Sequence, residues 1–168
     1  MKLKNIKKAP FEIATLLAAD KDIVRLLCDD RASVLIDKVD INKTVEDLIK
    51  EKYIGFYPAT EVGIKDIDRN TFIIINIEDM SLRSNDNNIS VNGTIYLTTD
   101  YSHALLENNT LRLIELADAI DSLLENQKLT SAGKIQLSSV SYVVFSDFRS
   151  GYRINFRFND QPTRKAEL

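Results

Sequence analysis

The chain has 168 residues, a formal net charge of -3, and 44% hydrophobic and 28% charged residues. A domain of this length buries about 70% of the surface that its unfolded chain would expose, so its core needs neither a disulfide nor a metal. The acidic balance excludes a uniformly basic nucleic-acid binder, and the single cysteine, Cys28, excludes an intrachain disulfide.

The first part of the chain, residues 1–60, is expected to be helical. Pro10 suits the first position of a helix, because its missing N–H would have no partner there. Asp20 is a suitable cap for a second helix. Thr44, followed three residues later by Asp47, resembles a capping box for a third.

No export signal or membrane span is evident in the helical part. Its most apolar stretch, "FEIATLLAAD", is interrupted by Glu12 and Thr15 and closed by Asp20. A lone Cys28 is typical of a buried small hydrophobe and fits a reducing compartment. These features favour the cytoplasm of the cell that makes the protein.

Two paired strands are predicted after residue 70. "TFIIINIEDM" (71–80) carries apolar residues on both side-chain parities, which indicates a central strand covered on both faces. "SNDNN" (84–88) is typical of a turn. "ISVNGTIYLTT", from Ile89, alternates apolar and polar residues and is expected to pair with the first strand in antiparallel fashion.

A long helix is predicted in "TLRLIELADAIDSLLENQ". Asn109 or Thr110 could cap its start. Its apolar stripe would consist of Leu113, Ile114, Ala117, Ile120 and Leu124. Its polar side would consist of Arg112, Glu115, Asp118, Ser122 and Glu125.

Two final strands follow the helix. "KIQLSSVSYVVF" contains a Ser138-Ser139 break that indicates a bulge. In "FSDFRSGYRINFRFND" one parity is apolar and the other polar, which predicts a strand with one buried face. The parity expected in the core is Tyr152, Ile154, Phe156 and Phe158.

These elements predict an α+β fold. It would be an antiparallel sheet of two β-hairpins with a long helix between them, packed on one face by helices, plus N-terminal helices. We expect a single domain over 1–168, with a helical N-terminal part (1–60), a β-β-α-β-β core (70–160) and a flexible tail (161–168).

No catalytic motif stands out. His103 is the only histidine, and no nucleophile–base partner is marked for it. The five glycines are isolated, so no phosphate-binding loop is present. We therefore expect no cofactor, no metal and no enzymatic activity.

The alternative enzyme class is a small metal-dependent nuclease, which needs converging carboxylates. Glu78 and Asp79 lie near a predicted strand end, and Asp66 and Asp68 lie in a predicted loop. No Glu-x-Lys follows on a partner strand to complete such a site.

The ordered segments resemble the tail terminator and neck (head–tail connector) proteins of tailed bacteriophages. "TFIIINIEDMSL" and "ISVNGTIYLTT" are similar to the family's paired strands before its long helix. "LRLIELADAIDSLLENQKLTSAGKIQLSSV" resembles that helix and the turn after it, and "FSDFRSGYRINFRFND" resembles the final strand. "DKDIVRLL" looks like an early helix of neck proteins. The simplest tail terminators are shorter, so the residues before 70 are a departure from the family.

The resemblance implies a structural virion protein that forms a six-fold ring, ends the tail tube and joins it to the head. Its partners would be copies of itself and other neck, connector and tail-tube proteins, with DNA passing through the ring but no sequence-specific nucleic-acid recognition and no membrane. Assembly would take place in the host cytoplasm. A head-completion adaptor or another tail structural protein is the alternative within this class.

The polar parity of the last strand is the candidate contact surface. Arg is enriched at interfaces and pairs with carboxylates through two parallel hydrogen bonds. The residues could instead be an ordinary solvated face that keeps the sheet soluble. The candidates are Arg149, Arg153, Asn155 and Arg157.

Overall fold

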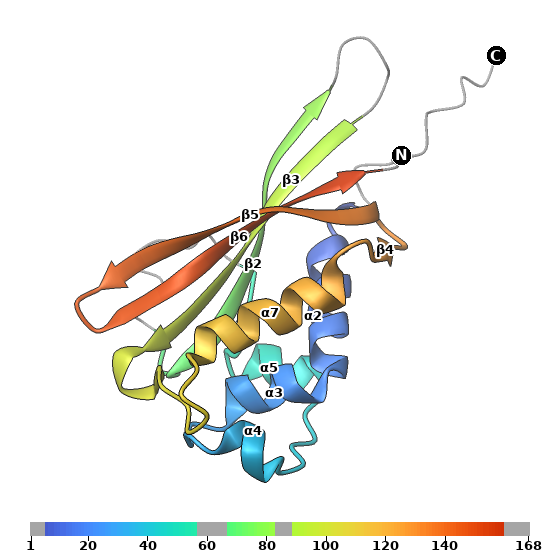
Figure 1. The fold of residues 1–168 in the computed structure, drawn as a ribbon. Coiled ribbons are helices and arrows are strands. Elements are labelled where there is room, and N and C mark those ends of the chain that lie inside the picture. The colour runs from blue at the N-terminus through green and yellow to red at the C-terminus, as the bar shows by residue number, and fades with distance from the viewer. Residues whose placement is uncertain (1–5, 57–66, 83–88, 160–168) are drawn as a thin grey trace, which may run out of the picture.

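A computed structural model describes residues 6–56, 67–82 and 89–159 (Figure 1). It shows the expected α+β fold, a curled sheet with helices gathered on one side (Figure 1). The helices are α2 (Ala9–Ala19), α3 (Lys21–Cys28), α4 (Val34–Asp37), α5 (Val45–Lys50), the short 3-10 helix η1 (Tyr101–His103) and α7 (Arg112–Leu124). The strands are β1 (Ile54–Gly55), β2 (Thr71–Leu82), β3 (Ile89–Asp100), β4 (Lys128–Leu129), β5 (Gly133–Ser146) and β6 (Arg149–Asn159). The predicted turn at 84–88 and the predicted tail at 161–168 lie outside the described residues.

The sheet joins two hairpins through their inner strands. Its six strands are ordered β1-β2-β3-β6-β5-β4, so β2–β3 and β5–β6 are hairpins and β3 pairs with β6. These pairs are antiparallel, which confirms the two-hairpin prediction with a helix between them. The two-residue strand β1 pairs in parallel with β2 and was not predicted. The predicted bulge in β5 is confirmed by a register shift between Leu137 and Ser139.

Capping residues fix where the N-terminal helices begin. The side chain of Asp20 accepts hydrogen bonds from the backbone N–H groups of Asp22 and Ile23, at the start of α3. Thr44 and Asp47 form the expected capping box of α5. Pro10 lies at the second residue of α2, not the first. An N–H at either position would have no partner inside the helix, so proline is tolerated at both.

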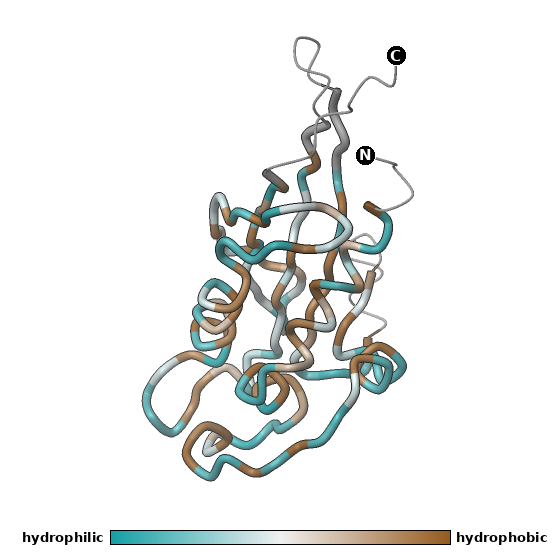
Figure 2. Tube along the Cα trace, turned by 90° about the vertical axis from the view of Figure 1, so that its right-hand side faces the viewer, coloured by the Kyte–Doolittle hydropathy of each residue, from teal (hydrophilic) through white to brown (hydrophobic). Residues whose placement is uncertain are grey.

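The main core lies between the helices and the inner face of the sheet. Hydrophobic and hydrophilic residues alternate along the helices and strands (Figure 2), as one-sided packing requires. β6 follows its predicted parity, with Ile154, Phe156 and Phe158 buried in this core and Tyr152 half-buried against it. The outer face carries a smaller cluster in which Phe72 and Ile74 are buried. β2 is therefore covered on both faces, as predicted.

The start and phase of α7 differ from the prediction. Neither Asn109 nor Thr110 caps the helix, which begins one residue later, with Leu111 at the cap position and no side-chain cap. Leu116 is fully buried, whereas Ile114, predicted in the apolar stripe, is 48% exposed. Arg112, predicted on the wet side, is fully buried. Leu113, Ile120 and Leu124 are buried as predicted, so the buried stripe agrees in part and differs at Ile114, Leu116 and Arg112. The burial of Arg112 is set by backbone carbonyls distant in sequence.

Candidate functional site

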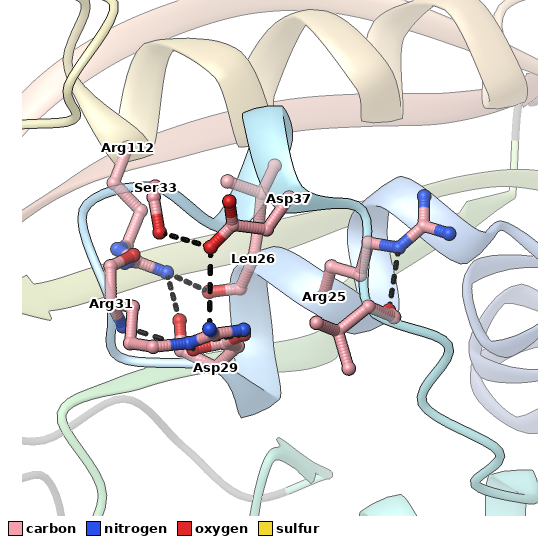
Figure 3. A network of polar contacts seen from close by, with 8 residues as sticks. Arg25, Leu26, Asp29, Arg31, Ser33, Asp37 and Arg112 are labelled. Atoms are coloured by element: carbon pink, nitrogen blue, oxygen red, sulfur yellow. Dashed lines mark hydrogen bonds and ion pairs between the residues drawn. The ribbon is translucent and has the colours of Figure 1, made fainter.

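The buried guanidinium of Arg112 joins the start of α7 to the end of α3. It donates hydrogen bonds to the carbonyls of Leu26 (2.8 Å), Asp29 (2.7 Å) and Arg31 (2.9 Å) (Figure 3). It also donates to the carbonyl of His103 at 2.9 Å. The last carbonyls of a helix have no hydrogen-bond partner inside the helix, and the N–H groups of Arg112 supply partners at the end of α3. Burial lowers the pKa of Arg112, although an Arg side chain stays protonated in proteins. The arrangement stabilises the fold and leaves the guanidinium no room for a ligand.

The loop around Arg112 is held by a second set of ion pairs (Figure 3). Arg31 pairs with Asp29 at 2.6 Å and with Asp37 at 3.3 Å. The hydrogen bond from Arg31 lowers the pKa of Asp29. Ser33 Oγ donates to Asp37 Oδ2 at 2.5 Å. Every carboxylate of this cluster is already engaged, which is typical of a structural loop.

The single histidine lies between a serine and an asparagine. Asn70 Nδ2 donates to Asp30 Oδ2 at 2.7 Å and lies 3.4 Å from His103 Nε2. His103 Nδ1 lies 2.9 Å from Ser102 Oγ, and the donor of that hydrogen bond is set by the tautomer of the ring. Ser102 follows the end of β3 at an exposed position.

Cys28 also lacks the surroundings of a reactive thiol. It packs against the main core. Burial raises its pKa to about 12, from 9.0. The thiolate is the nucleophilic form of cysteine, so at neutral pH this thiol is inert. The interpretation of Cys28 as a small core residue agrees with its packing.

The structure describes two of the four carboxylate side chains considered for a nuclease site. Glu78 and Asp68 are exposed. Asp66 and the side chain of Asp79 lie outside the described residues. Within the described ranges, no group of three or more His, Cys, Asp or Glu side chains is placed to hold a metal ion. None of the helices described is long and apolar enough to cross a membrane.

The predicted contact residues of β6 lie on the outer face of the sheet. Arg153 is exposed there. Arg157 donates to Gln136 Oε1 through Nε (3.0 Å) and Nη2 (2.8 Å). Asn155 Nδ2 donates to Ser139 Oγ at 2.8 Å. These side chains form a solvent-exposed polar surface, and two of them are hydrogen-bonded to side chains of β5.

Arg149, the fourth predicted contact residue, is engaged within the chain. Its Nε donates to Asp100 Oδ1 at 2.7 Å and its Nη2 to the carbonyl of Arg69 at 2.8 Å. Its guanidinium also lies over the ring of Phe72, 5.0 Å from the ring centroid. Arg149 therefore joins the tip of the β5–β6 hairpin to the loop before β2, and its side chain is only 12% exposed.

The sequence analysis missed an exposed apolar row on the inner face of the sheet. Val140, Tyr142 and Val144 of β5 are 54%, 57% and 61% exposed. The β5–β6 register places Val140 opposite the fully buried Ile154, so this row continues the core face beyond its helical cover. The sequence did carry a signal, since both parities of "SVSYVVF" contain large apolar residues.

One side of α7 ends beside the strand that carries this row. Ile114, Asp118, Asp121 and Glu125 recur at helical spacing and therefore form one stripe. Glu125 Oε2, at the end of this stripe, accepts a hydrogen bond from the backbone N–H of Leu137 at 2.9 Å, which places that end of the stripe beside β5. We define the α7–β5 surface as Ile114, Asp118, Asp121, Val140, Tyr142 and Val144.

The α7–β5 surface extends onto the segment before α7. A hydrogen bond with Tyr142 raises the pKa of Tyr101, so η1 contacts the row directly. The rings of Tyr142 and Tyr152 pack edge to face, with centroids 5.7 Å apart. Leu105 and Leu111 are exposed apolar residues of the same segment. Adjoining exposed apolar residues of this kind mark interaction sites more often than catalytic ones.

Comparison with known proteins gives a family. No curated protein matches the chain. The family model of YomW matches residues 20–158, which include α3 to α5, α7 and the sheet except for the last residue of β6. The matched part is most of the chain and contains both the polar outer face and the α7–β5 surface. The chain therefore belongs to the YomW family, a family of phage-associated proteins.

Proposed function

We propose that this protein is a structural virion protein of the phage neck, a tail terminator or head–tail connector that forms a ring at the end of the tail tube. The observation that carries the proposal is the exposed row of Val140, Tyr142 and Val144. This row lies on the face of the sheet whose other residues pack into the main core. Membership in a phage-associated family and the order of hairpin, helix and hairpin support the same assignment.

In this role the protein acts by assembly and not by catalysis. Large solvent-exposed apolar side chains are costly in a monomer and useful in a contact between subunits. A ring needs one heterologous contact, repeated until it closes. The partners would be copies of this chain and other neck and tail-tube proteins, and the site of action the virion, assembled in the host cytoplasm.

Oligomeric state and position in the particle test the proposal. Native mass spectrometry at high protein concentration is expected to show a hexamer, or a monomer that becomes a ring only beside a neighbouring neck or tail protein. Antibody labelling of virions in electron micrographs is expected to mark the head–tail junction. A stable dimer under both conditions would contradict the ring. Label at the capsid vertex alone would instead support a head-completion adaptor.

A further inference from the structure

The α7–β5 surface is apolar at the hairpin end and acidic along α7. Between Tyr101 and Gln127 the sequence has one Lys or Arg, which is Arg112, buried and hydrogen-bonded to carbonyls. The acidic residues of this range are Glu107, Glu115, Asp118, Asp121 and Glu125. A partner for this surface must therefore offer an apolar side chain flanked by positive charge.

The start of α2 has the complementary character. Phe11 is 44% exposed in the first turn of α2. Lys7 and Lys8, just before it, are exposed. Residues 1–11 contain four lysines and no acidic residue. The described start of the chain therefore presents an aromatic ring beside two positive charges.

These two surfaces lie at opposite ends of the molecule. Glu12 Oε2 accepts a hydrogen bond from the backbone N–H of Ser131 at 3.2 Å, which places the start of α2 at the turn between β4 and β5. That turn follows the C-terminal end of α7, whereas Ile114 and Tyr142 border the start of α7. The 13 residues of α7 span about 20 Å, and Figure 1 shows α2 and the β5–β6 turn on opposite sides. One copy cannot bring its own two surfaces together.

We propose that a second copy of this chain docks head to tail on the α7–β5 surface, with its Phe11 against Val140 and Tyr142 and its Lys7 and Lys8 beside Asp118 and Asp121. This contact rests on the proposed ring and names the surfaces that make it. It is heterologous, so it repeats around a ring without using either surface twice.

The charges also disfavour the symmetric alternative. If two α7–β5 surfaces faced each other across a two-fold axis, Asp118 and Asp121 would meet the same carboxylates of the partner copy. Like charges across a contact are unfavourable, whereas opposite charges favour encounter and fix the register of docking. The head-to-tail arrangement pairs acid with base at every contact.

A charge exchange tests the contact. One variant carries Asp118→Lys and Asp121→Lys, and the other carries Lys7→Glu and Lys8→Glu. Each alone should assemble at least ten-fold more weakly than the wild-type protein in sedimentation or native mass spectrometry. An equimolar mixture of the two should assemble again, because the introduced lysines of one variant then face the introduced glutamates of the other. The chain carrying all four changes should assemble by itself.

Controls separate loss of contact from loss of fold and from failure of the ring itself. Melting temperatures should be close to wild type, and Lys50→Glu with Lys52→Glu, two exposed residues elsewhere, should leave assembly unchanged. A chain with Phe11→Cys and Val140→Cys should form disulfide-linked multimers under oxidising conditions, which tests the contact without changing charge.

Three results would overturn the inference. Normal assembly of both charge variants would show that a ring uses other surfaces. Loss in each variant without rescue in the mixture or in the four-change chain, and without disulfide-linked multimers, would show that these surfaces do not meet. A wild-type chain that stays monomeric alone and beside its neck partners would overturn the contact and the ring together.

Discussion

The ring of Phe156 on β6 lies directly over Gly93 on the neighbouring β3. The two residues are paired in the sheet, and a Cβ placed on Gly93 would lie 2.3 Å from Cζ of Phe156 and 2.6 Å from the carbonyl oxygen of Asn76. Real Cβ atoms do not approach other atoms this closely. The missing side chain of Gly93 is therefore what allows Phe156 to pack flat on the sheet.

Phe156→Ala should strongly destabilise the protein. Truncating a buried Phe costs about 3–5 kcal/mol, a large share of the total stability of about 5–15 kcal/mol of a typical domain. Gly93→Ala should also destabilise it, because the new methyl group displaces the ring. Urea unfolding of both single variants and of the double variant measures the coupling. A strictly additive double variant would contradict the direct contact.

Arg112→Lys should be destabilising although the charge is kept. The guanidinium supplies donors to four carbonyls at once, and a lysine ammonium has only three hydrogens and cannot match the planar geometry. Each buried carbonyl left without a partner costs about 1–3 kcal/mol. Thermal unfolding measures the loss, and Arg31→Lys, at an exposed position of the same loop, is the control and should have a much smaller effect.

The sequence predicted the sheet and its faces better than it predicted the surfaces that remain open. Alternation along β6 and the two-sided apolar pattern of β2 follow from local periodicity, and both were confirmed. The burial of Arg112 was not predictable, because its four acceptors lie far from it in the chain or in irregular loops. The exposure of Val140 and Tyr142 was equally hidden, since it depends on where α7 stops covering the sheet.

The thiol of Cys28 should resist alkylation in the folded protein. Burial raises its pKa to about 12 from 9.0, so little thiolate exists at pH 8 and iodoacetamide should react far more slowly than after unfolding.

The pKa of this thiol is higher in the folded state than in the unfolded state, so the folded protein keeps the proton up to a higher pH. Stability is therefore unaffected by this group below pH 9 and falls as pH rises from about 9 towards 12. Cys28→Ala should lack this component in pH-dependent unfolding, and equal labelling rates of native and unfolded protein would contradict the buried thiol.

Substitution of the candidate catalytic residues should leave the proposed role in assembly intact. His103→Ala and the pair Glu78→Ala and Asp79→Ala remove the lone histidine and the carboxylates nearest to a nuclease pattern. Virion yield and tail length in a complementation assay should match the wild type. Purified protein that cleaves DNA in the presence of Mg²⁺ or Mn²⁺, with activity lost in the double variant, would instead favour the nuclease.

Charge reversal on the outer face of β6 distinguishes a contact surface from a solvated one. Arg153→Glu with Arg157→Glu should melt near the wild-type temperature, because exposed positions usually change stability by about 0.5 kcal/mol or less. Arg149→Glu is the matched comparison. It removes the donors to Asp100 and to the carbonyl of Arg69 and places a second carboxylate beside Asp100, so it should lower the melting temperature clearly.

If the protein forms the proposed ring and the outer face of β6 meets a neck protein, the Arg153→Glu and Arg157→Glu variant should fold and form the ring but fail to join that partner. The reason is that reversed charges across a contact repel where the original ones attracted. Melting, native mass spectrometry and virion yield, measured on the same protein sample, separate these steps. Normal melting with a normal virion yield would assign Arg153 and Arg157 to the solvated face of the sheet. A severe loss of stability in this pair, with Arg149→Glu tolerated, would contradict the structural roles given to all three arginines.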